Sequence, residues 1–272
     1  MTGGILKIMM CDYKFLAVQA AREAGAMLRE RLHHVHQIEY KGEINLVTEA
    51  DRMSEDMIVS RIRKAFPDHD LQMEESSEIN NGSPYRWIID PLDGTTNYAH
   101  GYPVFCVSIA LAFEGEVRLG VIYHPMMDEL FVAEKGQGVT CNGAIMCVSE
   151  TADSSKSLLA TGFPYDIPHT EQDNIGNFIA MAKRVQAIRR AGAAALDLAY
   201  VAAGRFDGFW ELKLAPWDLA AGCLMVTEAG GVLTNIDGGP FLLSSPHVLA
   251  SNGKIHDGLL AILREADDPR KR

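Results

Sequence analysis

The chain has 272 residues, of which 47% are hydrophobic and 22% charged, and its formal net charge is −11. This composition is typical of a globular protein with a large core, and the acidic balance argues against binding to the phosphate backbone of nucleic acids. No apolar stretch is long enough to span a membrane, no signal peptide is recognised and the five cysteines form no C-x-x-C pair, so we expect a cytoplasmic protein with free thiols.

Two amphipathic helices are predicted before the first long β region. Apolar side chains at helical spacing predict a helix over 12–34, in which Gly25 marks the close approach of another element. A second helix is predicted to begin at Thr48, with Asp51 three residues on, as in a capping box. Asp51 can therefore be explained as a helix cap, and a functional role for its carboxylate is the alternative. Lys41 lies between the two helices, in a polar stretch that we expect to be a loop.

A short apolar strand leads into the motif Asp-Pro-Leu-Asp-Gly-Thr-Thr, which occupies residues 90–96. Because Pro91 cannot donate to a sheet ladder, we expect the strand to end at Asp90. Gly94 permits a tight bend, and Thr95 or its neighbour is expected to cap a following helix. Two carboxylates at a strand end repel each other, so the motif calls for a counter-ion.

Four acidic residues lie at or near the ends of predicted elements, two of them within this motif, one after a short strand over 70–73 and one in the first turn of a helix over 217–229. They are Glu74, Asp90, Asp93 and Asp218. Oxygen ligands of this kind suit Mg²⁺ or Mn²⁺ rather than zinc. Four carboxylates exceed what one Mg²⁺ normally takes from a protein, so we predict two or more ions. Such ions hold a phosphate and acidify a water, which predicts phosphomonoester hydrolysis.

The spacing of the two motif aspartates excludes a different phosphatase chemistry. Haloacid-dehalogenase phosphatases use an Asp-x-Asp-Gly-Thr motif, in which the first Asp is phosphorylated. Here the residue two positions before Asp93 is Pro91, so that chemistry has no nucleophile.

The remaining elements follow in runs of strands and then a mixture of helices and strands. An antiparallel meander is predicted with strands over 106–113, 117–124, 129–134 and 137–147. Further strands are predicted over 157–161, 186–189, 206–210 and 248–250, and helices over 171–183, 193–203, 217–229 and 254–265. This order favours a layered α+β fold with mixed sheets.

With these motifs the chain resembles the inositol monophosphatase family, and it is most similar to the bacterial inositol-1-monophosphatases. The matching motifs occur in the family's order at 46–51, 74–76, 87–97, 192–200 and 216–222. The resemblance implies an α+β fold, the five-layer αβαβα sandwich of the sugar/inositol phosphatase superfamily. It also implies a single domain over 1–272, with a metal-site lobe over about 1–150 and a substrate-completing lobe over about 151–272.

The resemblance further implies Mg²⁺-dependent, lithium-sensitive hydrolysis of myo-inositol monophosphate by a homodimer, with two to three ions and Mn²⁺ as an alternative. The implied metal ligands are Glu74, Asp90, the Leu92 carbonyl, Asp93 and Asp218. Thr95, Asp51 and Glu74 would orient and deprotonate the attacking water. The implied substrate contacts are Gly94, Thr95, Gly192, Ala193, Ala194, Glu211 and Asp218. Lys41 would lie in a mobile loop that closes on the metals.

One position departs from the family. Ala193 stands where the family usually has Ser or Thr, so a hydroxyl that touches the sugar is missing. Fructose-1,6-bisphosphatase activity and 3′-phosphoadenosine 5′-phosphate phosphatase activity remain alternatives. So does an interaction protein that uses this fold as a platform. The expected partner is a small sugar or inositol phosphate, with no nucleic acid and no membrane.

Overall fold

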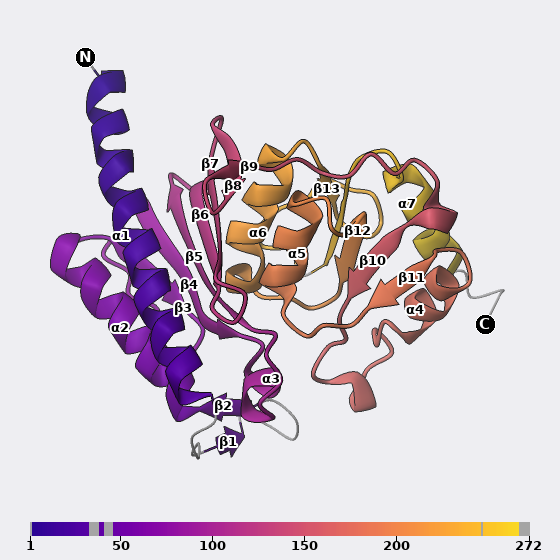
Figure 1. Ribbon diagram of the computed structural model, residues 1–272, viewed down its shortest axis with the longest axis horizontal. Helices are drawn as coiled ribbons and strands as arrows, with labels where there is room; N and C mark the ends of the chain where they lie inside the picture. The colour runs from indigo at the N-terminus through magenta and orange to yellow at the C-terminus, as the bar shows by residue number, and fades with distance from the viewer. Residues whose placement is uncertain (1, 33–37, 41–45, 246, 267–272) are drawn as a thin grey trace.

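The computed structural model describes residues 2–32, 38–40, 46–245 and 247–266. It is an α+β sandwich of five layers in the order αβαβα (Figure 1). Two helices cover the outer face of a seven-stranded sheet, two lie between this sheet and a five-stranded sheet, and two cover the far face of the second sheet. The predicted fold class is therefore confirmed.

The first layer consists of α1 (Thr2–Arg31) and α2 (Glu49–Ala65). α1 begins well before the predicted residue 12, because the good helix formers that follow Gly3 and Gly4 outweigh the cost of the glycines. The close approach predicted at Gly25 is confirmed, since a Cβ there would lie 2.5 Å from the Tyr123 ring. The helix therefore lies directly on the sheet.

The seven-stranded sheet carries the acidic motif and the meander. Its strands, in spatial order, are β3 (Asp70–Met73), β4 (Tyr85–Asp93), β5 (Cys106–Phe113), β6 (Glu116–His124), β7 (Glu129–Glu134), β8 (Gly138–Cys141) and β9 (Ala144–Ile145). β3 and β4 are parallel and every later pair is antiparallel, which confirms the predicted meander. Its last strand, predicted over 137–147, is instead two strands, β8 and β9, separated by a turn at 142–143. A separate ribbon pairs β1 (Ile38–Tyr40) with β2 (Leu46–Thr48).

The prediction that the motif strand ends at Asp90 is wrong, because β4 continues through Pro91 to Asp93. The pairing of β4 with β5 shifts register between Asp90, opposite Ser108, and Asp93, opposite Cys106. Proline is tolerated in a sheet at such a bulge, where no ladder hydrogen bond is required of it. The bulge lies between the two motif aspartates, and both are buried.

The second sheet has the order β11 (Ala187–Arg189), β10 (Leu158–Thr161), β12 (Gly208–Glu211), β14 (Val248–Ser251) and β13 (Val232–Thr234), the last of which was not predicted. The helices between the sheets are α5 (Ala194–Ala202) and α6 (Pro216–Glu228), and those on the far face are α4 (Ile175–Ala182) and α7 (His256–Ala266). Short helical turns complete the fold, namely α3 (Thr95–Ala99), η1 (Ser154–Lys156) and η2 (Ile167–His169).

The middle helix layer is packed at close range against its neighbours. A Cβ on Gly222 of α6 would lie 2.6 Å from the Leu198 side chain of α5, and a Cβ on Gly120 of β6 would lie 2.9 Å from the Ala221 carbonyl oxygen. Glycine at these positions lets α6 contact both α5 and the first sheet. No helix in the described part of the chain is long and apolar enough to cross a membrane.

Candidate active site

The acidic residues singled out from the sequence come together where β3 and β4 end and α6 begins. Asp90 and Asp93 are buried at the end of β4, with exposed fractions of 1% and 8%. Burial, followed by the negative charges of Glu74, Asp93 and Asp218, raises the pKa of Asp90 well above its usual range. The Asp218 carboxylate, which accepts a hydrogen bond from the Ala215 amide at 2.7 Å, is among the charges that act on Asp90. The sequence prediction that these four carboxylates meet is therefore matched by their placement.

Three members of this acid cluster form no ion pair with a basic side chain in the described part of the chain. They are Asp90, Asp93 and Asp218. Burial is the main cause that raises the pKa of Asp93 and that of Asp218 to about 7. Buried carboxylates so close together repel each other when ionised, so the cluster favours the binding of protons or of a cation.

The donor chemistry of the acid cluster fits a hard divalent cation. All the donors are oxygens, which Mg²⁺ and Mn²⁺ prefer. Among residues 2–32, 38–40, 46–245 and 247–266, no three His, Cys, Asp or Glu side chains are arranged as a metal-binding group. The fit to a cation therefore rests on the oxygen donors and on the negative charges that Asp90, Asp93 and Asp218 bring together.

Asp51 takes part in the capping box predicted for α2 and also contacts Thr95. As part of the capping box of α2, its Oδ2 accepts hydrogen bonds from the Thr48 amide at 2.8 Å and the Thr48 hydroxyl at 2.5 Å. Its Oδ1 lies 2.8 Å from the Thr95 hydroxyl, which also lies 3.1 Å from the Leu92 carbonyl oxygen. Asp51 is fully buried, and burial raises its pKa. The cap therefore fixes the carboxylate that holds Thr95.

Two further side chains of α2, which the sequence analysis missed, hold the acidic segments in place. Ser54 donates a hydrogen bond to the Pro91 carbonyl oxygen at 2.7 Å, at the bulge of β4. Glu55 accepts one from the Glu75 amide at 2.9 Å, directly after Glu74. Residues at i, i+3 and i+4 share one face of a helix, and Asp51 completes this set. The spacing of Asp51, Ser54 and Glu55 on one face of the predicted helix is the feature of the sequence that could have indicated their shared role.

Thr95 does not cap a helix, contrary to the prediction. The N-cap of α3 is Gly94, which has φ of 99° and makes no side-chain cap. A Cβ at Gly94 would lie 2.9 Å from the Val104 carbonyl oxygen, so the tight bend predicted from this glycine is real. The hydroxyl of Thr95 instead points to Asp51.

The start of α5 is attached directly to the acid cluster. The N-cap of α5 is Ala193, whose side chain cannot accept a hydrogen bond, and the Asp93 carboxylate takes that place by accepting from the Ala195 amide at 2.7 Å. Asn97 of α3 donates to the Ala191 carbonyl oxygen at 2.8 Å. Gly192, Ala193 and Ala194, which lie between these anchors, are thereby held beside Asp93.

Glu211 lies at the end of β12, near Asp218 but outside the acid cluster. Burial and then the charge of Asp218 raise its pKa to about 8, while Arg190 acts in the opposite direction. In the described part of the chain no hydrogen bond or ion pair is made by its carboxylate. Lys213 is not its partner, because its ammonium group bonds to Asp166 and Thr170 at 2.7 Å each. The Glu211 carboxylate is therefore available to a ligand.

Two residues near the site were not singled out from the sequence. Desolvation and then the negative charges of Glu74 and Asp93 raise the pKa of Tyr165, an exposed residue that is therefore within electrostatic range of the acid cluster. Asp197 of α5 is buried, and its Oδ1 has no hydrogen-bond partner among the described residues. No pattern in the sequence connects either residue with the acidic motif. Lys41, expected in a mobile loop, lies outside the described residues.

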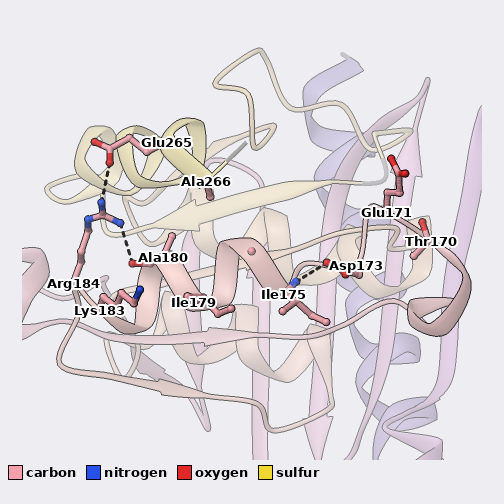
Figure 2. Close-up of a pocket in the computed structure, with 11 residues that line it drawn as sticks. Thr170, Glu171, Asp173, Ile175, Ile179, Ala180, Lys183, Arg184, Glu265 and Ala266 are labelled. Carbon is pink, nitrogen blue, oxygen red and sulfur yellow. Dashed lines mark hydrogen bonds and ion pairs between the residues drawn. The ribbon is translucent and has the colours of Figure 1, made fainter. Parts of the chain in front are cut away.

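A separate pocket of about 990 Å³ lies between α4 and α7 (Figure 2). Arg184 crosses one end of it, with hydrogen bonds to Glu265 at 2.8 Å and to the Ala180 carbonyl oxygen at 3.2 Å. Ile175 and Ile179 of α4 contribute apolar surface to its lining. None of the four clustered acids lines this pocket, so it is not the candidate catalytic site.

The αβαβα fold and its acid-lined site define the class of the protein, a phosphatase that acts on small-molecule phosphate esters. The model of the inositol monophosphatase family matches residues 11–268, and the chain belongs to this family. It is 46% identical to an inositol-1-monophosphatase of Synechocystis sp., over 90% of this chain and 86% of the relative.

Two other relatives extend this comparison. The chain is 42% identical to a protein of Pseudomonas aeruginosa named Nus factor SuhB, over 92% of this chain and 94% of that one. The solved structure of an inositol monophosphatase from Anabaena (Nostoc) sp. PCC 7120 superimposes with a TM-score of 0.88 at 43% identity. That match covers 97% of this chain and 99% of the other, so the fold is shared from end to end.

Proposed function

We propose that the protein hydrolyses myo-inositol monophosphate to inositol and phosphate, with Mg²⁺ as its cofactor and water as the nucleophile. The observation that carries this proposal is the buried acid cluster, in which Asp90 lies within range of the negative charges of Glu74, Asp93 and Asp218. The names of the Synechocystis and Anabaena relatives support inositol monophosphate as the substrate.

The metal ligands in this proposal are those implied by the resemblance to the family. Glu74, Asp90, the Leu92 carbonyl, Asp93 and Asp218 would hold two to three Mg²⁺ ions, with Mn²⁺ as an alternative. When bound, the ions supply Lewis-acid polarisation of the phosphate and lower the pKa of a water molecule. The four carboxylates supply the negative charge that keeps these cations in place.

Thr95 and Asp51 would orient the attacking water and receive its proton together with Glu74. Because the Thr95 hydroxyl can donate to Asp51 Oδ1 at 2.8 Å, its oxygen lone pairs can accept a hydrogen bond from the water. Asp51 is held from its other side by Thr48, so the hydroxyl is aimed before substrate arrives. Such positioning is the contribution of a general-base group to hydrolysis.

The substrate itself would be held by two groups of contacts. The amides of Gly94 and Thr95, at the tight bend after β4, would bind the phosphate. The substrate hydroxyls would meet Glu211 and the segment of Gly192, Ala193 and Ala194. Because Ala193 has no hydroxyl, a larger part of the binding of the substrate hydroxyls would fall to the carboxylate of Glu211.

An assay of phosphomonoesters tests the proposal. We expect hydrolysis with millimolar Mg²⁺ and its loss in excess EDTA, with inositol monophosphate preferred over fructose 1,6-bisphosphate and 3′-phosphoadenosine 5′-phosphate. Preference for either of the latter would assign the same site to another substrate. Lithium inhibition, a homodimer in solution and a cytoplasmic location belong to the same proposal and are open to separate measurement.

We expect no phosphoenzyme to form during turnover, because the residue two before Asp93 is a proline and the Thr95 hydroxyl is directed at Asp51. Acid quenching during turnover of ³²P-labelled substrate, followed by recovery of the protein, measures covalent phosphate. Stoichiometric label on the protein would contradict direct attack by water.

We expect Glu211→Gln to raise the KM for inositol phosphate roughly tenfold, since a charge-assisted hydrogen bond contributes about 1.5–3 kcal/mol. p-Nitrophenyl phosphate lacks ring hydroxyls, so its kcat/KM should change little. The two substrates are compared in parallel, with a melting curve for each protein. Equal losses on both substrates, with a lower Tm, would instead show that Glu211 has a structural role.

A second candidate function comes from the relative named Nus factor SuhB. A protein with this name raises the alternative of an interaction role in which catalysis is secondary. The turnover assay bears on this alternative, because the absence of Mg²⁺-dependent hydrolysis of any phosphomonoester would leave the interaction role alone.

A further inference from the structure

We infer that Gly162 is a positioning residue. By having no side chain it leaves a space, here called the seat, which the Glu211 carboxylate occupies, and it thereby fixes the carboxylate that recognises substrate hydroxyls. The inference rests on the proposed role of Glu211 in substrate binding. It concerns a residue directly after β10, in a loop that contributes none of the proposed metal ligands.

The two residues are neighbours because β10 and β12 pair in parallel. Thr161, the last residue of β10, lies opposite Trp210, so Gly162 comes next to Glu211. A Cβ built on Gly162 would lie well under 3.0 Å from both carboxylate oxygens and the Cδ atom of Glu211. The carboxylate therefore occupies the space that any other residue at 162 would fill with its side chain.

The backbone that forms this seat is fixed by a buried hydrogen-bond network. Asn174 donates to the Gly162 carbonyl oxygen at 2.7 Å and accepts from the Trp210 indole at 2.8 Å. The Thr161 hydroxyl donates to the Trp210 carbonyl oxygen at 2.6 Å. Thr161, Asn174 and Trp210 are almost fully buried, so the strand ends that carry Gly162 and Glu211 are tied to each other.

The contact with Gly162 helps to decide where the carboxylate points, because no hydrogen bond or ion pair in the described part of the chain fixes it. The charge of Arg190 acts on Glu211 without such a bond, and Lys213 is bound to Asp166 and Thr170. The close contact with a glycine is thus a direct geometric constraint on the Glu211 side chain. Preorganised groups bind at a lower entropic cost.

This geometry predicts that Gly162→Ala displaces the carboxylate rather than the fold. The φ angle of Gly162 is not in the left-handed region, so alanine fits its backbone. The atoms that the new methyl group would meet are the far end of a long side chain, which can rotate away. The substitution is therefore expected to move the Glu211 carboxylate and to leave the backbone in place.

We expect Gly162→Ala to raise the KM for inositol monophosphate roughly five- to tenfold, with kcat for p-nitrophenyl phosphate unchanged and Tm within about 2 °C of the parent. The matched control is Gly176→Ala in α4, where a Cβ would meet nothing within 4 Å. This control should leave KM for both substrates unchanged.

A double variant isolates the contact. In Glu211→Ala the carboxylate is absent, so adding Gly162→Ala should cause no further rise in KM, and the two effects should be non-additive. Additive effects, or equal losses on both substrates with a lower Tm, would overturn the inference. An unchanged KM in Gly162→Ala would overturn it as well, provided that Glu211→Gln raises KM. If Glu211→Gln has no effect, the proposed role of Glu211 itself is wrong, and the inference falls with it.

Discussion

Replacement of Asp93 by asparagine is expected to lower kcat/KM by at least about a thousandfold, because a lost metal ligand removes several kcal/mol of transition-state stabilisation. Asparagine has nearly the same volume, and its carbonyl oxygen can still accept the hydrogen bond from the Ala195 amide. The substitution removes the negative charge that Asp93 contributes to the binding of a cation. Steady-state kinetics at millimolar Mg²⁺ measure the loss.

Asp70→Asn is the matched control for this variant. Asp70 is also a buried aspartate of the first sheet, but it lies at the start of β3, where it accepts hydrogen bonds from the Asn81 and Ser83 amides and pairs with Arg86. Its replacement should lower Tm and leave kcat nearly unchanged. Near-normal kcat in Asp93→Asn would show that Asp93 does not hold a metal ion.

The sequence was sufficient to predict the order of the long elements and the meeting of the four acids. Hydrophobic periodicity and turn residues carry that information along the chain, as in the meander from Cys106 to Cys141. The end of β4 was predicted wrongly because the rule that proline stops a strand assumes regular pairing, whereas Pro91 lies in a bulge. Whether a strand bulges depends on its neighbour, which a local pattern does not contain.

The same limit applies to the contacts that surround the acids. Thr95 was expected to cap a helix, a local role, but its hydroxyl bonds to Asp51, far away in the chain. The seat of Glu211 on Gly162 likewise requires the parallel pairing of β10 with β12. Contacts between distant segments follow from packing. A single sequence therefore indicates which residues can take part in the chemistry, but not which of them are in contact.

Without Mg²⁺, the protein is expected to lose stability as the pH rises from about 4 through about 7, and the part of this loss that falls between about pH 6.5 and 8 is the one to measure. Burial raises the pKa of Asp93 and of Asp218 to about 7 and that of Asp90 well above its usual range. In the unfolded chain these groups ionise near pH 4. Between the unfolded and folded pKa values the folded state binds more protons, so the free energy of unfolding falls with rising pH.

The choice of pH window separates this effect from the buried histidines. Burial lowers the pKa of His69, His124 and His256, so their contribution to stability increases as the pH rises and is complete above the unfolded histidine value of about 6.5. Above that pH the buried carboxyls with raised pKa values dominate, namely those of the acid cluster together with Glu211 and Asp197. Each one costs up to about 1.4 kcal/mol per pH unit until it is ionised in the folded state.

Thermal melts in EDTA should therefore show Tm falling by about 5 °C or more across this window. Millimolar Mg²⁺ should reverse the fall, because a cation that binds only the folded state stabilises it by about 2.7 kcal/mol at one hundred times its Kd. In Asp93→Asn both the slope with pH and the shift with Mg²⁺ should shrink, whereas Asp70→Asn should retain both. A Tm that is flat with pH in EDTA and indifferent to Mg²⁺ would show that the acid cluster is a structural feature and not a cation site.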